Sequence, residues 1–518
     1  MKFFKIVLFF FICQGIAVAQ GKHDYMWMIG EGNLSGDVYP VGVEFNFNDQ
    51  KLDIDVFFRP TDMYLTNASI CDEKGNLLFY TNGCFIVDAS HEMMMNGDSL
   101  NPTLYSDLRC RGDFPSGSVP QSMIILPHPH EDSSHLYYVI HQLVELGTQP
   151  VNFFLSTLLY TQVDMTKNGG LGAVTGKRQV IYQDSAKLHL SQLTAVKHEN
   201  GKDWWILFSE RKSNTYLRTH LSGTGFSVVE KQDIGFPVSR EGEGGGQAVF
   251  SPDGQKYVRY TPKDGAYIYD FDRSTGLLSN FEQVLIQDTL GSSSGGIAIS
   301  PNSQYLYVSN VRNLYQLDLS ADDIAGSLLH IAAYDGSLTP FPANFYLMQL
   351  GPDCKIYMIS TNGVYTMHII HQPDERGAAC QFEQNGINIW LATGERVGTG
   401  ISIPNFPNYR LGVGPPCDPD IATSVRVVPG KRQELNIEIY PNPTTGQFFI
   451  SFNNQDKKDK LTLSITDVTG KIVYFEQIMP TYAGRNNLLV GDHSLLSGLY
   501  FVTLSNSHNT QTAKIYIL

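Results

Sequence analysis

The architecture of this chain follows from one segment, Ala248-Val249-Phe250-Ser251-Pro252-Asp253-Gly254-Gln255-Lys256-Tyr257-Val258. Two short runs rich in apolar and aromatic residues flank the four-residue turn Ser251–Gly254. Proline presets φ at the second turn position, aspartate bonds its neighbouring backbone, and glycine accepts a positive φ. The segment therefore predicts a tight β-hairpin with a buried face.

The same hairpin recurs along the chain. Its clear copies turn at Asp72–Gly75, Ser251–Gly254, Ser300–Ser303 and Gly351–Cys354, and the last three of these turns start 49 and 51 residues apart. Two weaker copies turn at residues 199–201 and 127–134, and in most copies a second turn marks the start of a third strand. Repeated antiparallel units of about fifty residues are typical of β-propeller blades, because one blade cannot bury both of its faces alone.

We therefore predict an all-β fold, with a propeller of six to eight blades, seven fitting best, over residues 22–414. Seven blades would take about 55 residues each. Residues 41–47 and 386–403 match no hairpin copy, and together they could close the ring with strands from both ends of the chain. A row of sandwich domains is the alternative, but sandwiches repeat at about 90–100 residues.

Residues 1–20 are typical of a secretory signal peptide. Lys2 and Lys5 supply the positive start, Ile6–Ile12 is an apolar run, and Ala17–Ala19 offers small residues before a cleavage point. A lipid anchor on Cys13 is the alternative, which the bulky residue before it disfavours. The apolar run is too short to span a bilayer, and no later segment offers about 18 consecutive apolar residues, so we expect no transmembrane segment after signal removal.

Charge and cysteine content narrow the function further. The formal net charge of −14 argues against a nucleic-acid partner, because phosphate contacts need a clustered basic surface. Six of the seven cysteines follow the signal peptide, and export permits disulfides, but six cysteines allow 15 pairings. We expect one or two disulfides in loops and some buried free thiols.

The end of the chain carries four motifs in a specific order. They are Ile437–Gly446, Leu463–Val473, Ser497–Val502 and Lys514–Leu518, and a segment without strand pattern, residues 415–434, precedes them as a predicted linker. In these motifs, residues 435–518 resemble the type A C-terminal sorting domain of the type IX secretion system, a small β-sandwich. A small sandwich that merely stabilises the protein is the alternative.

That resemblance implies a partner, a route and a location. The partner is the type IX secretion machinery in the outer membrane, the route passes through the periplasm, and the product is secreted or held at the cell surface, often after cleavage of the sorting domain. The residues that carry the sorting motifs are Tyr440, Pro441, Asn442, Pro443, Gly446, Gly470, Lys471, Gly498, Tyr500 and Lys514.

The preceding repeats resemble large secreted Bacteroidetes proteins that carry the same sorting domain. The matching phrases are Gly75–Gly83, Gln349–Asp353 and Ile403–Gly412. The resemblance implies export from a Bacteroidetes-type bacterium and brings no defined ligand or activity with it.

Catalytic motifs give no lead. The chain has no His-Glu-x-x-His helix, and its Gly-x-Ser-x-Gly match, Gly291–Gly295, precedes an expected strand where a nucleophile elbow needs a helix, so we predict no catalytic residue, no metal site and no cofactor. His128, His130 and His135 form the densest group of possible metal ligands, but they fall in a long turn where polar residues are expected.

Four amides form the candidate ligand site. Asn67, Gln121, Gln192 and Gln247 each stand just before or at the start of an expected innermost strand, so they should ring one mouth of the propeller channel. Amides donate and accept hydrogen bonds, which suits a sugar or a peptide. The alternative is that they bond water and neighbouring loops and so close the channel.

The sequence thus favours a secreted or cell-surface binding protein without enzymatic activity, whose ligand is an unidentified glycan or protein. One alternative is a secreted polysaccharide hydrolase or lyase with carboxylates at the channel mouth. Another is a structural component of the cell-surface layer or motility apparatus. Converging acidic side chains with raised pKa values would favour the enzyme.

Overall fold

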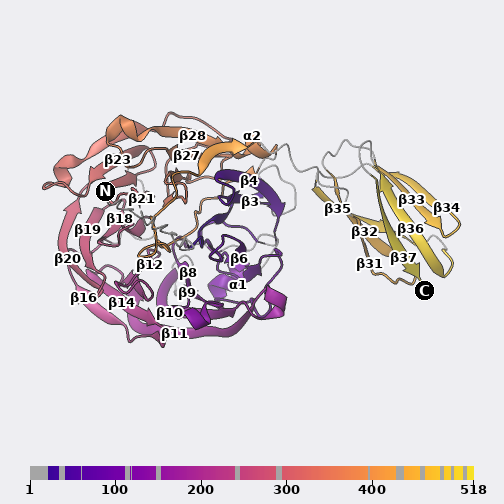
Figure 1. Cartoon of the computed structure of the whole chain (residues 1–518), viewed down its shortest axis with the longest axis horizontal. Coiled ribbons are helices and arrows are strands. Elements are labelled where there is room, and N and C mark those ends of the chain that lie inside the picture. Colours follow the sequence, from indigo (N-terminus) through magenta and orange to yellow (C-terminus); the bar gives the residue numbers. More distant parts are fainter. Residues whose placement is uncertain are drawn as a thin grey trace, which may run out of the picture. The chain divides into compact units, whose positions relative to one another are not determined.

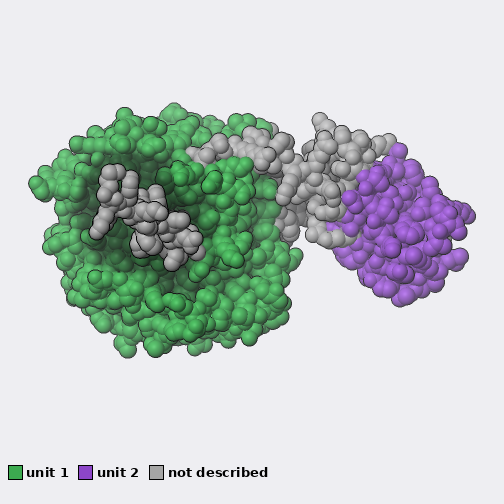
Figure 2. Space-filling view, in the orientation of Figure 1, with its two compact units in different colours: residues 1–426 green, residues 427–518 purple. Residues whose placement is uncertain are grey.

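The computed structural model describes residues 21–33, 41–59, 61–110, 117, 119–146, 153–239, 245–286, 294–394, 397–426, 437–454, 461–478, 484–491, 495–505 and 510–518. The chain divides into two compact units, residues 1–426 and 427–518 (Figure 1, Figure 2). The predicted signal peptide, residues 1–20, lies outside the described residues.

Small sheets follow one another around a ring in the first unit (Figure 1). Six of them are antiparallel and consecutive in sequence. Their strands are β5 (Ala68–Cys71), β6 (Leu77–Thr81) and β7 (Ile86–Asp88); β8 (Met123–Pro127), β9 (Leu136–Leu146), β10 (Phe153–Asp164) and β11 (Ala173–Leu188); β12 (Thr194–Lys197), β13 (Trp204–Ser209), β14 (Thr215–Ser222), β15 (Gly225–Phe226) and β16 (Glu230–Asp233); β17 (Gln247–Phe250), β18 (Lys256–Thr261), β19 (Gly265–Asp272) and β20 (Leu277–Val284); β21 (Gly296–Ile299), β22 (Tyr305–Ser309), β23 (Asn313–Asp318) and β24 (Leu329–Ala333); and β25 (Met348–Leu350), β26 (Ile356–Met358), β27 (Thr366–Ile370) and β28 (Phe382–Asn388).

A seventh sheet combines both ends of the unit. It contains β1 (Met26–Ile29), β3 (Val41–Asn46), β4 (Lys51–Phe58) and, from the C-terminal side, β30 (Ala422–Arg426), which runs parallel to β4. Beside it, β2 (Glu31–Asn33) pairs with β29 (Val397–Gly398). With these seven sheets among the described residues, the prediction of an all-β propeller is confirmed.

The predicted hairpin turns lie between the first and second strands of their sheets. In the turn from β17 to β18, Ser251 N donates to Lys256 O at 2.9 Å and Gly254 N donates to Ser251 O at 2.7 Å. Gly254 has φ 73°, the left-handed conformation that glycine adopts without strain. Local turn chemistry therefore sets the position of these hairpins.

Ring closure differs in detail from the prediction. Residues 41–46 do belong to the closing sheet, but residues 382–388 form β28 in the preceding sheet instead. Residues 399–411 then run alongside β1 without forming a regular strand: Gly30 N donates to Thr399 O at 3.0 Å, and the Phe406 ring lies 6.1 Å from that of Trp27. The segment expected to be a linker, residues 415–434, includes β30, and the first unit extends to Arg426.

Two disulfides bind loops of the first unit. Cys84 pairs with Cys110 at the end of α1 (Leu104–Cys110), and Cys354 pairs with Cys417. Cys71 and Cys380 are buried free thiols. Two disulfides and buried free thiols are what the cysteine count led us to expect.

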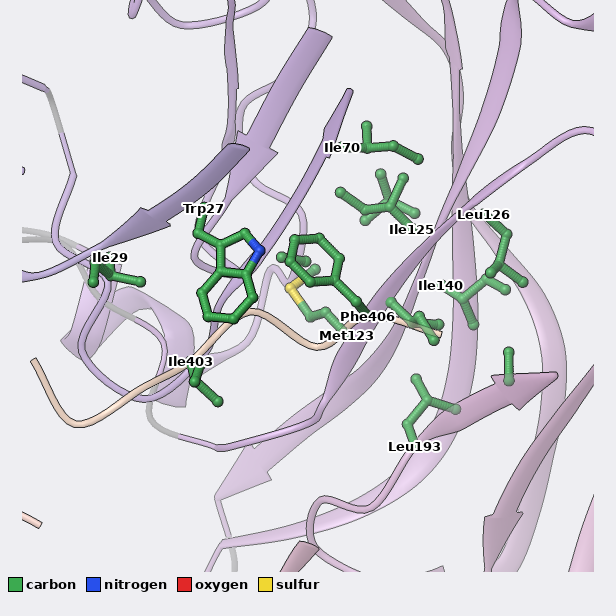
Figure 3. Close-up of a cluster of buried hydrophobic side chains, with 14 of the residues drawn as sticks. Trp27, Ile29, Ile70, Met123, Ile125, Leu126, Ile140, Leu193, Ile403 and Phe406 are labelled. Atoms are coloured by element: carbon green, nitrogen blue, oxygen red, sulfur yellow. The ribbon is translucent and has the colours of Figure 1, made fainter. Parts of the chain in front are cut away.

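The main core of the propeller reaches inward to the axis. Figure 3 shows Ile403 and Phe406, from the C-terminal side of the unit, among Trp27, Met123 and Leu193. A short helix, α2 (Ile389–Thr393), precedes that segment. Residues from both ends of the unit therefore share one hydrophobic core.

The second unit is a small β-sandwich. One sheet has β31 (Ile437–Tyr440), β32 (Phe448–Asn454) and β35 (Gly484–Val490), and the other has β34 (Ile472–Ile478), β33 (Leu461–Asp467), β36 (Gly498–Ser505) and β37 (Thr510–Ile517). Alternate residues of β33 are buried, and they share a core with Phe448 and Ile450 of the other sheet.

Candidate functional site at the propeller axis

The innermost strands of the consecutive sheets begin at one end of the propeller axis. Asn67, Gln121, Gln192 and Gln247 lie there, just before or at the start of β5, β8, β12 and β17. We call this the amide end. The opposite end, where turns such as Ser251–Gly254 lie, we call the turn end.

Gln247 joins three innermost strands through its amide. Its Nε2 donates to Met348 O of β25 at 2.7 Å, and its Oε1 accepts from Ile297 N of β21 and Met348 N, both at 3.1 Å. The side chain is buried. Its hydrogen-bonding capacity thus goes to the backbone of neighbouring blades.

Gln121 makes the corresponding connection across the axis. Its Nε2 donates to Ala248 O at 3.0 Å, and its Oε1 accepts from Ala248 N at 2.8 Å. The same Nε2 lies 3.2 Å from Asn405 Oδ1. The start of β8 is therefore bonded both to β17 and to the C-terminal segment.

The other two amides also bond to the chain. Gln192 Nε2 donates to Tyr260 O at 2.8 Å, and its Oε1 accepts from Arg259 Nε at 2.5 Å. Asn67 Nδ2 donates to Met28 O at 2.7 Å. All four residues lie just before or at the start of an inner strand, and a ligand role for them stays a prediction.

Residues 399–411, which we call the closing segment, pass through the middle of the ring. Asn405 Nδ2 donates to Met123 O of β8 at 2.8 Å and to Leu193 O before β12 at 2.9 Å. Nearer the turn end, Tyr409 Oη donates to Ile125 O at 2.7 Å. These contacts tie the closing segment to blades far from it in sequence.

A buried ion pair fixes the turn-end part of the closing segment. Arg410 binds both carboxylate oxygens of Asp24, with 2.8 Å between Nη2 and Oδ2, and its Nε donates to Pro416 O at 2.8 Å. The side chains are 3% and 6% exposed. A bidentate pair of this kind gives both strength and a defined geometry.

A cavity of about 70 Å³ remains beside the closing segment. Small and apolar residues of the inner strands, such as Ala195, Ala248 and Ala298, line one side, and Asn405 and Phe406 line the other. Ligand pockets usually measure about 300–1,000 Å³. The axial space suits a few water molecules better than a sugar or a peptide.

Among the described residues, burial raises the pKa of three carboxyl groups, those of Glu44, Asp353 and Asp374. Burial, followed by the neighbouring charge of Asp55, raises the pKa of Glu44 to about 7, and the two residues face each other across β3 and β4. Burial also raises the pKa of Asp353, which accepts a 2.7 Å hydrogen bond from Tyr357 Oη. The alternating pattern of β3 gave no signal that Glu44 would be mostly buried.

The histidine-rich turn holds its own local contacts. His130 Nδ1 accepts from Asp132 N at 3.2 Å, and Glu131 pairs with Lys202 at 2.8 Å. Among the described residues, no group of three or more His, Cys, Asp or Glu side chains is arranged to hold a metal ion. Nor does that part of the chain contain a helix long and apolar enough to cross a membrane.

The sorting motifs come together in the second unit. Asn442 Nδ2 donates to Lys514 O at 2.8 Å, and Asn442 Oδ1 accepts from Tyr516 N at 3.0 Å, so the first motif is bonded to the last strand. Gly470, with φ 85°, forms the turn before Lys471 and β34. Tyr440 ends β31, Pro441, Pro443 and Gly446 follow in the next loop, and Gly498 and Tyr500 open β36.

The two interpretations of the amides predict different results for Gln247→Met. If the amide is structural, its loss leaves buried backbone groups unpaired and lowers the free energy of unfolding by about 2–4 kcal/mol. Urea unfolding followed by tryptophan fluorescence measures this loss. Gln349→Met is the matched control, because among the described residues the Gln349 side chain bonds only to the adjacent Leu350 O, and its loss should cost below about 1 kcal/mol. Unchanged stability with lost ligand binding would support the ligand interpretation instead.

Comparison with known proteins gives a family match for the second unit only. Residues 438–518 match the family described as a secretion system C-terminal sorting domain. No curated protein sequence is similar to this chain. Among solved structures, a putative 6-phosphogluconolactonase from Bacteroides fragilis is 12% identical, with a TM-score of 0.36, over 74% of this chain and 96% of the other.

Two further structures are similar over most of the chain. PorZ, a surface component of the type IX secretion system of Porphyromonas gingivalis, is 10% identical with a TM-score of 0.28, over 92% of this chain and 68% of its own. The propeller of Dos1 is 11% identical with a TM-score of 0.39, over 71% and 85% of the two chains. At these scores the activities of those proteins say nothing about this one. The chain is thus a β-propeller protein that carries, at residues 438–518, a C-terminal sorting domain of the type IX secretion system, which directs it to the cell surface or the medium.

Proposed function

We propose that this exported propeller is a binding protein, and that it contacts a protein or glycan through the connections at its amide end. The supporting observation is a set of exposed apolar side chains there, with exposed fractions from 40% for Trp390 to 72% for Leu391. The set comprises Phe236, Leu285, Leu338, Phe341, Trp390 and Leu391.

These six residues share a position in the fold. Each lies in a connection that follows an outer strand, after β16, β20, β24 or β28, and each such connection returns toward the next inner position at the amide end. Large apolar side chains exposed at one end of a fold are candidates for an interaction site, because leaving them in water is unfavourable. Aromatic residues such as Phe236, Phe341 and Trp390 are also frequent anchors of binding energy.

The closed axis supports the same proposal. Its amides bond to the backbone, and the closing segment occupies its middle. A rigid ring of this kind is well suited to holding surface loops in fixed positions. We therefore place recognition on the loops and not in the channel.

The binding surface predicts the behaviour of one triple variant. Phe236→Ser, Phe341→Ser and Leu391→Ser together should weaken binding at least about tenfold, since three anchors lose their apolar contact area. The mature chain, residues 21–518, would be tested on a glycan array and on washed cells of the producing bacterium. The control changes two exposed apolar residues nearer the turn end, Val228→Ser and Leu277→Ser, and should bind normally.

Two alternatives remain as outcomes of the same experiment. Release of reducing ends from a polysaccharide would identify a hydrolase, and unsaturated products would identify a lyase. Glu44→Gln is then the first variant to test, because the pKa of about 7 lets Glu44 keep a proton near neutral pH.

Normal binding by the triple variant, together with intact folding, would contradict the proposed surface. Failure to bind any glycan or cell, with a defect in surface-layer assembly or motility on deletion, would favour a structural component.

A further inference from the structure

A buried arginine lies between two blades near the amide end. Arg259 of β18 is fully buried and faces the sheet of β12–β16, where its guanidinium carbon lies 5.8 Å from the centre of the Tyr216 ring. The side chains that act most strongly on its charge are tyrosines, Tyr216, Tyr257 and Tyr269. Within the described residues, no carboxylate pairs with this arginine.

Apart from Gln192 and the Tyr216 side chain, the guanidinium has few protein partners among the described residues. Nε donates to Gln192 Oε1 at 2.5 Å, but Nη1 and Nη2 have no hydrogen-bond acceptor in the described part of the chain. A buried cation without a counter-charge is strongly unfavourable, and buried charges are normally paired. The two free Nη groups of one guanidinium form a fork that matches two oxygens of an oxyanion.

Further unpaired groups accompany Arg259. Both ring nitrogens of His189 and the hydroxyl of Ser191 are buried and lack a well-formed hydrogen bond among the residues that the structure describes, although the backbone of Leu190 and Ser191 lies close to the His189 ring. Burial lowers the pKa of His189 well below its usual value, and the positive charge of Arg259 acts in the same direction, while nearby backbone groups of Leu190 and Ser191 oppose the shift. The ring is therefore neutral, with one N–H donor, in electropositive surroundings.

The backbone beside these groups is strained. Ser191 and Gln192 are consecutive non-glycine residues with φ values of 72° and 63°. Such conformations persist only where the surrounding structure enforces them, and they cluster at functional sites. Here the strained pair carries the Ser191 hydroxyl and the amide that holds Arg259 Nε.

We propose that Arg259, His189 and Ser191 form an oxyanion site, in which the two Nη groups of Arg259 bind two oxygens of a carboxylate or an inorganic phosphate. Ser191 Oγ and the N–H of neutral His189 supply the remaining donors. The site is separate from the apolar surface proposed above, so either proposal can fail alone.

The test is anion-dependent stability of the mature chain, residues 21–518. Thermal unfolding is followed by tryptophan fluorescence while sodium acetate or sodium phosphate is added at constant ionic strength. A ligand that binds only the folded state raises the unfolding temperature in a saturable way. We expect a saturable rise in unfolding temperature with at least one of the two anions. The anion that binds more tightly indicates whether the natural ligand is a carboxylate or a phosphate. In Arg259→Gln the response should be at least tenfold weaker.

Two controls separate a built site from general salt effects. Arg376→Gln, at an exposed arginine, should respond as the unchanged protein does. Glu241→Gln and Glu243→Gln test the other explanation, in which a carboxylate of the chain itself, from the connection before β17, neutralises Arg259. If these two variants destabilise as much as Arg259→Gln, and no anion has an effect, the proposal is overturned.

A crystallographic measurement covers the case in which Arg259→Gln does not fold. Crystals of the mature chain soaked in selenate should show an anomalous selenium peak within hydrogen-bonding distance of the Arg259 Nη atoms. Ordered water alone at that position, with no saturable response to acetate or phosphate in solution, would overturn the oxyanion site.

Discussion

Arg410→Met should lower the free energy of unfolding of the propeller by about 3–5 kcal/mol, because it leaves Asp24 buried without its counter-charge. The substitution also removes the donors to Asp24 and to Pro416 O, which together hold the closing segment at the turn end. Urea unfolding followed by tryptophan fluorescence is the measurement. All four tryptophans, residues 27, 204, 205 and 390, lie in the first unit, so the signal reports on the propeller alone.

Two variants test the cause of that loss. Asp24→Leu combined with Arg410→Met removes both charges and should recover part of the lost stability, since no unpaired charge remains. Lys202→Met breaks the exposed ion pair with Glu131 and should leave the unfolding midpoint unchanged. A loss below about 1 kcal/mol for Arg410→Met would show that the closing segment is held mainly by its other contacts.

Deletion of residues 435–518 should reduce delivery to the cell surface and the medium at least about tenfold and leave the protein in the periplasm. The deleted part contains the matched sorting domain, residues 438–518, through which the secretion machinery identifies its cargo. Immunoblots of periplasmic, surface and medium fractions measure the distribution.

Folding must be separated from sorting in this experiment. The truncated chain keeps β30, the closing segment and both disulfides, so its tryptophan fluorescence should match that of the full-length protein. Residues 435–518 fused to an unrelated periplasmic protein should conversely cause its export. Normal surface delivery of the folded, truncated chain would refute the assigned role of this domain.

The fold was predictable where local chemistry determines it. Turns such as Ser251–Gly254 repeat at near-constant spacing, and their proline, aspartate and glycine residues act on their own backbone, so no distant partner is needed. The closing segment was not predictable in this way, because Asn405 and Arg410 bond to residues 212–386 positions away and follow no strand period. The sequence singled out residues 403–412 only through their resemblance to other secreted proteins.

The candidate sites also combine features that local sequence predicts with features that depend on distant partners. The amides were located from their positions before inner strands, but their partners, such as Ala248 and Met348, became visible only in the assembled ring. Arg259 lies on the same face of β18 as Tyr257. This alternation was the one signal in the sequence that the Arg259 side chain is buried between blades. Its missing counter-charge depends on packing between blades, about which a single sequence says nothing.

The order of parts along the chain has a consequence for quality control. The residues that complete the ring, together with Cys417 and β30, lie directly upstream of the sorting domain. A chain truncated before these residues would lack both the segment that closes the ring and the sorting domain. Incompletely closed propellers would therefore not be exported to the cell surface. Proteolytic cleavage after Arg426 would leave the closing segment, the Cys354–Cys417 disulfide and β30 in the propeller, so the released propeller would keep its ring closure.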